Sequence, residues 1–190
     1  MVTSVQVRDL LKQHGTCRLQ DSSQWTGDIP LPAGIADFYR DVGPVNITIN
    51  GFGNPTIMPS LSKLWDQQVG YRWHGVTLEP ILDWNNDWIV VAYEGGNPYI
   101  YSHGRILFDL CGASVWEPIE AFEDLNSMAA CLSILGSIAL SAGDDFTDKG
   151  GVIRARFRDE AVSRITEIQG SRSDAEAVLV TAGWECPILP

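Results

Sequence analysis

The sequence lacks the motifs by which several large enzyme classes are recognised. It has no glycine-rich dinucleotide fingerprint, no phosphate-binding loop and no His-Glu-x-x-His zinc motif. Its four cysteines, Cys17, Cys111, Cys131 and Cys186, form no Cys-x-x-Cys pair, and none of the three histidines lies at ligand spacing beside them. We therefore expect no metal site and no bound cofactor.

Long uninterrupted apolar runs are also missing. No stretch approaches the ~18 apolar residues that a bilayer span needs, and charges interrupt the apolar positions of the N-terminal segment MVTSVQVRDLLKQHG. We therefore expect no secretion signal, no membrane contact and a cytoplasmic location. With 45% hydrophobic and 19% charged residues among 190, the chain is typical of one folded domain, or of one domain with an appended subdomain.

Basic side chains are nearly absent from the middle of the chain. Residues 77–148 contain twelve acidic side chains and only Arg105 on the basic side, so this segment carries −11, which equals the net charge of the whole chain. Such a concentration of negative charge repels nucleic acids and anionic membranes and attracts basic surfaces. We therefore expect a basic protein partner and no nucleic acid. Acids that merely solvate loops and helix N-termini would give the same composition.

Residues 87–116 contain the clearest pattern of secondary structure. Residues 88–93, Trp-Ile-Val-Val-Ala-Tyr, are rich in the β-branched and aromatic residues of a buried strand. The sequence Glu-Gly-Gly-Asn-Pro follows, and its residues favour a chain reversal. A second turn at 102–104 separates two further apolar segments. The pattern predicts an antiparallel meander of three strands with turns at 94–97 and 102–104.

Periodicity elsewhere predicts an α+β order of elements. Helical spacing of apolar residues predicts helices, and alternation predicts strands, in the following places: helices at 7–14, 33–42 and 61–69, a strand at 45–49 and an extended piece at 56–58. Pro118 is expected to open a long helix that runs through Ile119, Phe122 and Leu125, since four acidic residues crowd its positive end.

The last part of the chain is expected to form a helical unit of its own. We divide the chain into residues 1–142, the main domain, and 143–190, a C-terminal extension packed on it. Residues 152–157 alternate and the following residues return to helical spacing. Ser173 and Glu176 form a capping-box pattern that predicts a final helix, and Trp184 is expected to anchor the extension.

Four blocks of sequence, in this order along the chain, together carry a family resemblance: Leu31-Pro32 with Phe38-Tyr39 and Gly43; Asn54-Pro55; Trp88 to Ala92 with Gly95-Gly96-Asn97-Pro98; and Gly112 to Trp116. Over residues 30–140 the chain resembles the SUKH superfamily, the Smi/Knr type of domain found in bacterial immunity proteins and fungal cell-wall regulators. Two departures are Asn97, where the family usually has Asp, and Ser102-His103, where an acidic residue often follows the strand.

The resemblance implies a mixed, largely antiparallel sheet flanked by helices, with a variable surface that binds other proteins without catalysis. We therefore expect an immunity protein that occludes a cognate bacterial toxin, whose substrate groove in a nuclease is basic. An intracellular regulator or scaffold of the Smi/Knr type is the alternative. An enzyme of another class, such as a glycan hydrolase, ranks third. The oligomeric state stays open.

The residues chosen for partner binding are Asp83, Asp87, Glu94 and Glu117, because they flank turns at strand ends; no catalytic residue is expected. The enzyme alternative uses some of the same side chains, since a pair of carboxylates among the first three could act on a glycan that stacks on Trp73, Trp84 or Trp88. The sequence Gly-x-Ser-x-Trp at 112–116 begins like a nucleophile elbow, but tryptophan replaces the second glycine.

Overall fold

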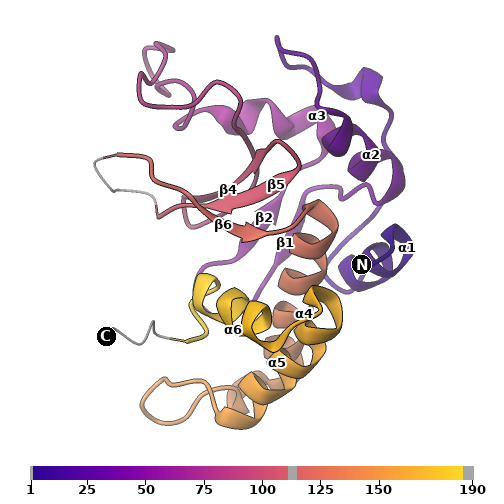
Figure 1. The fold of residues 1–190 in the computed structure, drawn as a ribbon, viewed down its shortest axis with the longest axis vertical. Helices are drawn as coiled ribbons and strands as arrows, with labels where there is room; N and C mark the ends of the chain where they lie inside the picture. The colour runs from indigo at the N-terminus through magenta and orange to yellow at the C-terminus, as the bar shows by residue number, and fades with distance from the viewer. Residues whose placement is uncertain (1, 111–114, 186–190) are drawn as a thin grey trace.

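The computed structural model describes residues 2–110 and 115–185 and shows an α+β fold (Figure 1), as the sequence predicts. In this part of the chain six strands form one open sheet in chain order, and every neighbouring pair is antiparallel, without the parallel pairs of a mixed sheet. The strands are β1 (Ile47–Ile49), β2 (Thr56–Met58), β3 (Ile89–Glu94), β4 (Asn97–Ser102), β5 (Arg105–Phe108) and β6 (Ile119–Phe122).

The helices of the described residues lie before and after the central strands. They are α1 (Ser4–Leu11), α2 (Ala33–Asp41), α3 (Leu61–Leu64), α4 (Leu125–Ala142), α5 (Ala155–Gln169) and α6 (Arg172–Thr181), with single 3₁₀ turns η1 (Ser22–Gln24), η2 (Asp66–Gln68) and η3 (Gly143–Asp145). The predicted helix at 61–69 is shorter than expected, because it tightens into η2 after one turn.

The predicted three-strand meander is confirmed. β3 pairs with β4, and β4 pairs with β5, with Ile89 opposite Tyr101 and Tyr101 opposite Ile106. Gly95 and Gly96 supply positive φ angles of 57° and 101° at the first turn, a backbone conformation that glycine adopts without steric cost. The turn residues and the strand register therefore agree.

The prediction of a helix that begins at Pro118 is wrong for its first turns. Residues 119–122 form the edge strand β6, in which Ile119 pairs with Phe108 and Phe122 pairs with Ile106. The free edge of β5 supplies backbone partners, and pairing there buries the Phe122 ring, which is 2% exposed. Helix α4 begins only after Asp124, whose carboxylate accepts a hydrogen bond from the Ser127 backbone N–H at 2.7 Å.

Helix α4 also corrects the expectation about apolar runs. The helical stretch Leu125–Asp145 contains an 18-residue window with a mean hydropathy of 1.6 and is long and apolar enough, by length and composition, to cross a membrane. In the fold, 72% of this window is buried inside the protein. Serine, glycine and alanine interrupt its larger apolar residues, which is why it does not read as one continuous run.

Both faces of the sheet are covered by apolar side chains. On one face Ile89, Tyr101 and Ile106 belong to the large core that also contains α1, α2 and α4. On the other face Val90, Ile100 and Leu107 pack against aromatic residues from the loop between η2 and β3. In Figure 1 this loop projects at the upper left.

Helix α5 packs beside α4, and α6 packs on α5 and against β6 (Figure 1); Ile165, Leu179 and Trp184 belong to the main core. The Trp184 ring is 5% exposed and lies 5.0 Å from the Phe146 ring. The cap of α6 is Ser171, not Ser173 as predicted, because the Ser171 hydroxyl accepts the Asp174 N–H at 3.1 Å. Residues 155–157 belong to α5 and are not extended.

Truncating the anchoring tryptophan tests this packing. Trp184→Ala should lower the free energy of unfolding by about 3–5 kcal/mol, because it removes a buried ring and leaves a cavity. Urea denaturation followed by circular dichroism measures the change. The matched control is Val180→Ala on α6, shortly before Trp184 in the chain, where the residue is 39% exposed and the change should stay within about 0.5 kcal/mol. A loss below about 1 kcal/mol for Trp184→Ala would show that the extension is not packed.

Candidate partner-binding surface

Four aromatic residues cover the second face of the sheet, and we call Tyr71, Trp84, Trp88 and Trp116 the tryptophan cluster. The Trp84 ring lies 5.3 Å from the Trp88 ring and 5.2 Å from the Trp116 ring, both edge to face. The Tyr71 ring lies 5.9 Å from Trp116. Edge-to-face contacts at these separations are favourable beyond simple burial. The cluster therefore ties the loop before β3 to the segment before β6.

The backbone at the start of this loop is fixed by a buried glutamine. Gln68 is fully buried; its side-chain amide donates to the carbonyls of Leu64 at 2.8 Å and Val90 at 2.9 Å, and its oxygen accepts the Val90 N–H at 2.9 Å. The Tyr71 hydroxyl donates to the Gly96 carbonyl at 2.7 Å. Breaking these bonds would leave buried polar groups without partners, which is costly, so they hold the start of the loop at one place on the sheet.

Three of the four predicted site residues lie around the tryptophan cluster. Asp83, Asp87 and Glu117 are exposed, and each is the immediate chain neighbour of a tryptophan in the cluster. The Asp87 carboxylate lies 3.8 Å from Nε2 of His103. Within residues 2–110 and 115–185, the carboxylates of Asp83 and Glu117 meet no basic side chain at ion-pair distance, which leaves their charge available to a partner.

Glu94, the fourth predicted residue, points to the opposite face of the sheet. Its carboxylate is 3.4 Å from the hydroxyl of Tyr99 and lines a small space with Leu132 and Trp184. Burial raises the pKa of the Glu94 carboxyl above its ordinary value. Asp87 and Glu94 flank opposite ends of β3, about 23 Å apart along the strand at 3.3 Å per residue, so they do not form a catalytic pair.

Several other acidic side chains of residues 77–148 make contacts within the protein. Asp124 caps α4, and Asp145 pairs with Arg154 and Arg156. Asp109 is 8% exposed and accepts backbone N–H groups from Leu110 and Glu117 at 2.7 and 2.8 Å. Caps, ion pairs and loop contacts therefore engage part of the acidic side chains of residues 77–148, whereas Asp83, Asp87 and Glu117 lie around the tryptophan cluster.

Sequence reasoning missed the exposed aliphatic side chains of the same loop. Leu82 is 98% exposed, Val76 95% and Leu78 67%. Loop positions have no periodicity, so no pattern marks these residues, nor the neighbouring exposed Glu79. We define the acidic loop surface as the following residues: Val76, Leu78, Glu79, Leu82, Asp83, Asp87 and Glu117. Apolar side chains among charges are the composition of a protein-binding surface.

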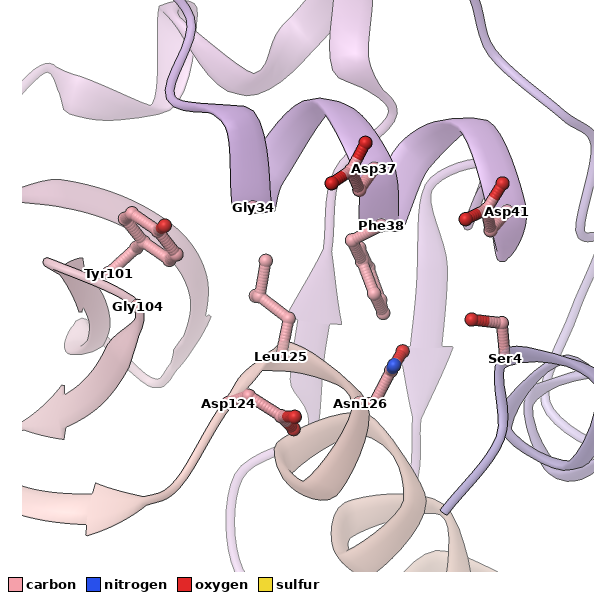
Figure 2. A pocket seen from close by; sticks show the side chains of 10 residues that line it. All are labelled: Ser4, Gly34, Asp37, Phe38, Asp41, Tyr101, Gly104, Asp124, Leu125 and Asn126. Carbon is pink, nitrogen blue, oxygen red and sulfur yellow. The ribbon is translucent and has the colours of Figure 1, made fainter. Parts of the chain in front are cut away.

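A second hollow, of about 210 Å³, lies between α2 and α4 and has acidic walls. Figure 2 shows Phe38 of α2 pointing into it, with Asp124 across from Asp37 and Asp41. Both α2 carboxylates bind the Arg40 guanidinium, at 2.6 and 2.8 Å, and Asp124 is the α4 cap. These carboxylates are therefore engaged within the protein.

Two observations bear on the glycan-hydrolase alternative and on metal binding. Trp84 is 5% exposed, so its ring cannot stack on a glycan. Across the two described ranges, no group of three His, Cys, Asp or Glu residues could hold a metal ion. Ser114, Cys111 and Cys186 lie outside the described residues.

Comparison of the chain with protein-family models, with curated proteins and with solved structures finds no match. The SUKH resemblance of residues 30–140 therefore stays a prediction from the sequence motifs.

The half-buried carboxyl of Glu94 generates a prediction about pH. Its pKa is raised in the folded state, so stability is lost as pH rises from the ordinary value of 4.5 through the folded pKa. Glu94→Gln should therefore raise the melting temperature at pH 7, and this gain should shrink below pH 4.5, where the wild-type carboxyl is protonated in both states. Thermal unfolding at pH 7 and below pH 4.5 measures the change in melting temperature, and Glu123→Gln, at an exposed position, is the control. A loss of stability independent of pH would contradict the assignment.

Proposed function

We propose that this chain is a non-catalytic, cytoplasmic protein-binding domain whose acidic loop surface docks on a basic partner. The observation that carries the proposal is the combination on one loop of nearly fully exposed aliphatic side chains with unpaired carboxylates. Leu82 and Val76 are 98% and 95% exposed, and Asp83 lies beside Leu82. Exposing these aliphatics to water in the free protein is unfavourable, and a partner that covers them gains about 25 cal/mol per Å² of apolar surface.

The backbone beneath this surface is arranged to make binding efficient. Gln68 and Tyr71 fix the loop to the sheet through hydrogen bonds of 2.7 to 2.9 Å. A loop already held in one conformation loses little entropy when a partner binds, so more of the interaction energy becomes affinity. The unpaired carboxylates supply long-range attraction, which raises the association rate with a basic surface.

An immunity protein is the specific function that these properties favour. A nuclease toxin must carry lysine and arginine along its substrate groove to bind phosphates, and an acidic surface of fixed shape occludes such a groove. The SUKH resemblance supports the same function through its bacterial members. A regulator of the Smi/Knr type, supported by the resemblance to the fungal members, is the second candidate. Both functions use the acidic loop surface, and they differ in the partner.

Charge reversal tests the surface. The triple variant Asp83→Lys, Asp87→Lys and Glu117→Lys should slow association with the partner by at least about tenfold at low salt, since steering contributes factors of about 10 to 1,000. Stability should change little, because exposed charges contribute little to folding. The control reverses three exposed acids elsewhere, Asp144, Asp159 and Glu167, and so has the same net charge. Stopped-flow association at several salt concentrations measures both proteins.

The partner for this experiment is the product of a toxin gene next to the gene for this chain, or the protein that co-purifies from the native host. Protection of cells that express the toxin separates an immunity protein from a regulator. Equal association rates for the triple variant, the control and the wild type, at every salt concentration, would refute the acidic docking surface.

A further inference from the structure

A groove with aromatic walls runs beside the acidic loop surface. It consists of two adjoining cavities of about 670 and 490 Å³, which share Arg72 and Asn86. Their volumes lie in the range of about 300–1,000 Å³ that is typical of ligand sites. The smaller cavity is bounded by the following residues: Asp28, Trp65, Arg72, Trp73, Leu78, Pro80 and Asn86. We call this space the Trp73 cavity.

Three half-buried indoles form a row beside the Trp73 cavity, distinct from the tryptophan cluster, and two of them, Trp65 and Trp73, line the cavity. The Trp65 ring lies 5.2 Å from the Trp25 ring on one side and 5.2 Å from the Trp73 ring on the other. The Trp25 indole N–H donates to the Ile29 carbonyl at 2.8 Å. The row is therefore held by its own ring contacts and by the backbone, and it presents rigid aromatic surface to the cavity.

The guanidinium of Arg72 already contacts this row of indoles. The guanidinium carbon of Arg72 lies 5.4 Å from the centre of the Trp65 ring, within cation–π distance. Its nitrogens donate to the carbonyls of Trp88 at 3.1 Å and Asn86 at 2.7 Å. Arg72 thus shows the contacts that a planar cation makes in this cavity, and its hydrogen bonds are made within the chain.

The carboxylates around the groove outnumber its arginine. Asp28 lines the Trp73 cavity and Asp87 lines the larger one. Asp28 is exposed and meets no basic side chain at ion-pair distance in the described parts of the chain. Glu79 of the acidic loop surface lies in the chain between Leu78 and Pro80, which both line the Trp73 cavity, and adds further negative charge. The charge of the groove therefore favours a cationic occupant.

The wall of the cavity contains a strained leucine. Leu78 has a φ angle of 58°, which a branched side chain rarely adopts. Two backbone hydrogen bonds hold it, from Leu78 N–H to the His74 carbonyl at 3.0 Å and from His74 N–H to the Glu79 carbonyl at 2.9 Å. These hydrogen bonds offset the strain and hold an exposed apolar side chain at the rim of the Trp73 cavity.

We propose that the Trp73 cavity binds an arginine side chain from an extended segment of the protein partner. The guanidinium stacks on the Trp73 ring and donates to the Asp28 carboxylate, while Leu78 and Pro80 contact its aliphatic stem. Arginine fits better than lysine, because a planar guanidinium both stacks on an indole and forms a paired hydrogen bond with a carboxylate. This inference rests on the proposed function and specifies the partner's chemistry.

Short peptides test the cavity without the partner. Acetyl-Leu-Ala-Arg-Ala-Leu-amide is titrated into the ¹⁵N-labelled full chain while the indole N–H signals are followed by NMR. The Trp65 and Trp73 signals should shift in a saturable way, and the signal of the buried Trp184 should not. The lysine peptide should bind at least about threefold more weakly, since a compact ammonium stacks less well. The peptide with citrulline, which is uncharged, should give no saturable shift.

A conservative variant at the carboxylate completes the test. Asp28→Asn should weaken binding of the arginine peptide about tenfold, because one charge-assisted hydrogen bond is lost. Asp144→Asn, which changes an exposed acid elsewhere, should leave the binding unchanged. Absence of a saturable shift at Trp73, equal binding of citrulline, or unaltered binding by Asp28→Asn would overturn the inference. The triple reversal of Asp83, Asp87 and Glu117 leaves Asp28 and Trp73 intact, so the two proposals can fail separately.

Discussion

The need to bury both faces of one strand determines most of this structure. The first four residues of β3 are all buried, so that the strand has apolar side chains on each side of the sheet. Helix α4 and its neighbours cover one face. No helix in the described residues covers the other, and a loop with tryptophans at its inner positions does so instead. Gln68, fully buried beneath that loop, joins the two coverings by bonding to Val90 in the strand between them.

The chemistry of the candidate surface follows from this arrangement. A loop that covers a sheet has to use its largest apolar side chains inward, and here Trp84 and Trp88 do so. Their chain neighbours are then turned to water, and Asp83, just before Trp84, and Asp87, just before Trp88, are both exposed. Position on the loop, and not local charge density alone, separates the acids that face solvent from those, such as Asp109 and Asp124, whose oxygens satisfy backbone groups.

The sequence predicts the parts of this fold that depend on local pattern. Residues 88–108 form the expected meander because strand period and turn residues are both local. Edge strand β6 was missed, since its partner edge on β5 has no signal in residues 119–122 themselves. Asp83, Asp87 and Glu117 were chosen beside turns, whereas the inward direction of Glu94 depends on Trp184, ninety residues away. The indole row likewise joins residues 25, 65 and 73, which only the folded chain brings together.

The burial of α4 has a consequence for how the chain is made. Synthesis delivers the strands and then α4, and the helices α5 and α6 that complete its covering come last. Roughly 40 further residues have to be added, which takes about 2–8 s at the ordinary 5–20 residues per second. During that interval one side of a strongly apolar helix meets water on the ribosome. A nascent chain of this kind is a natural client for a chaperone that binds exposed apolar segments.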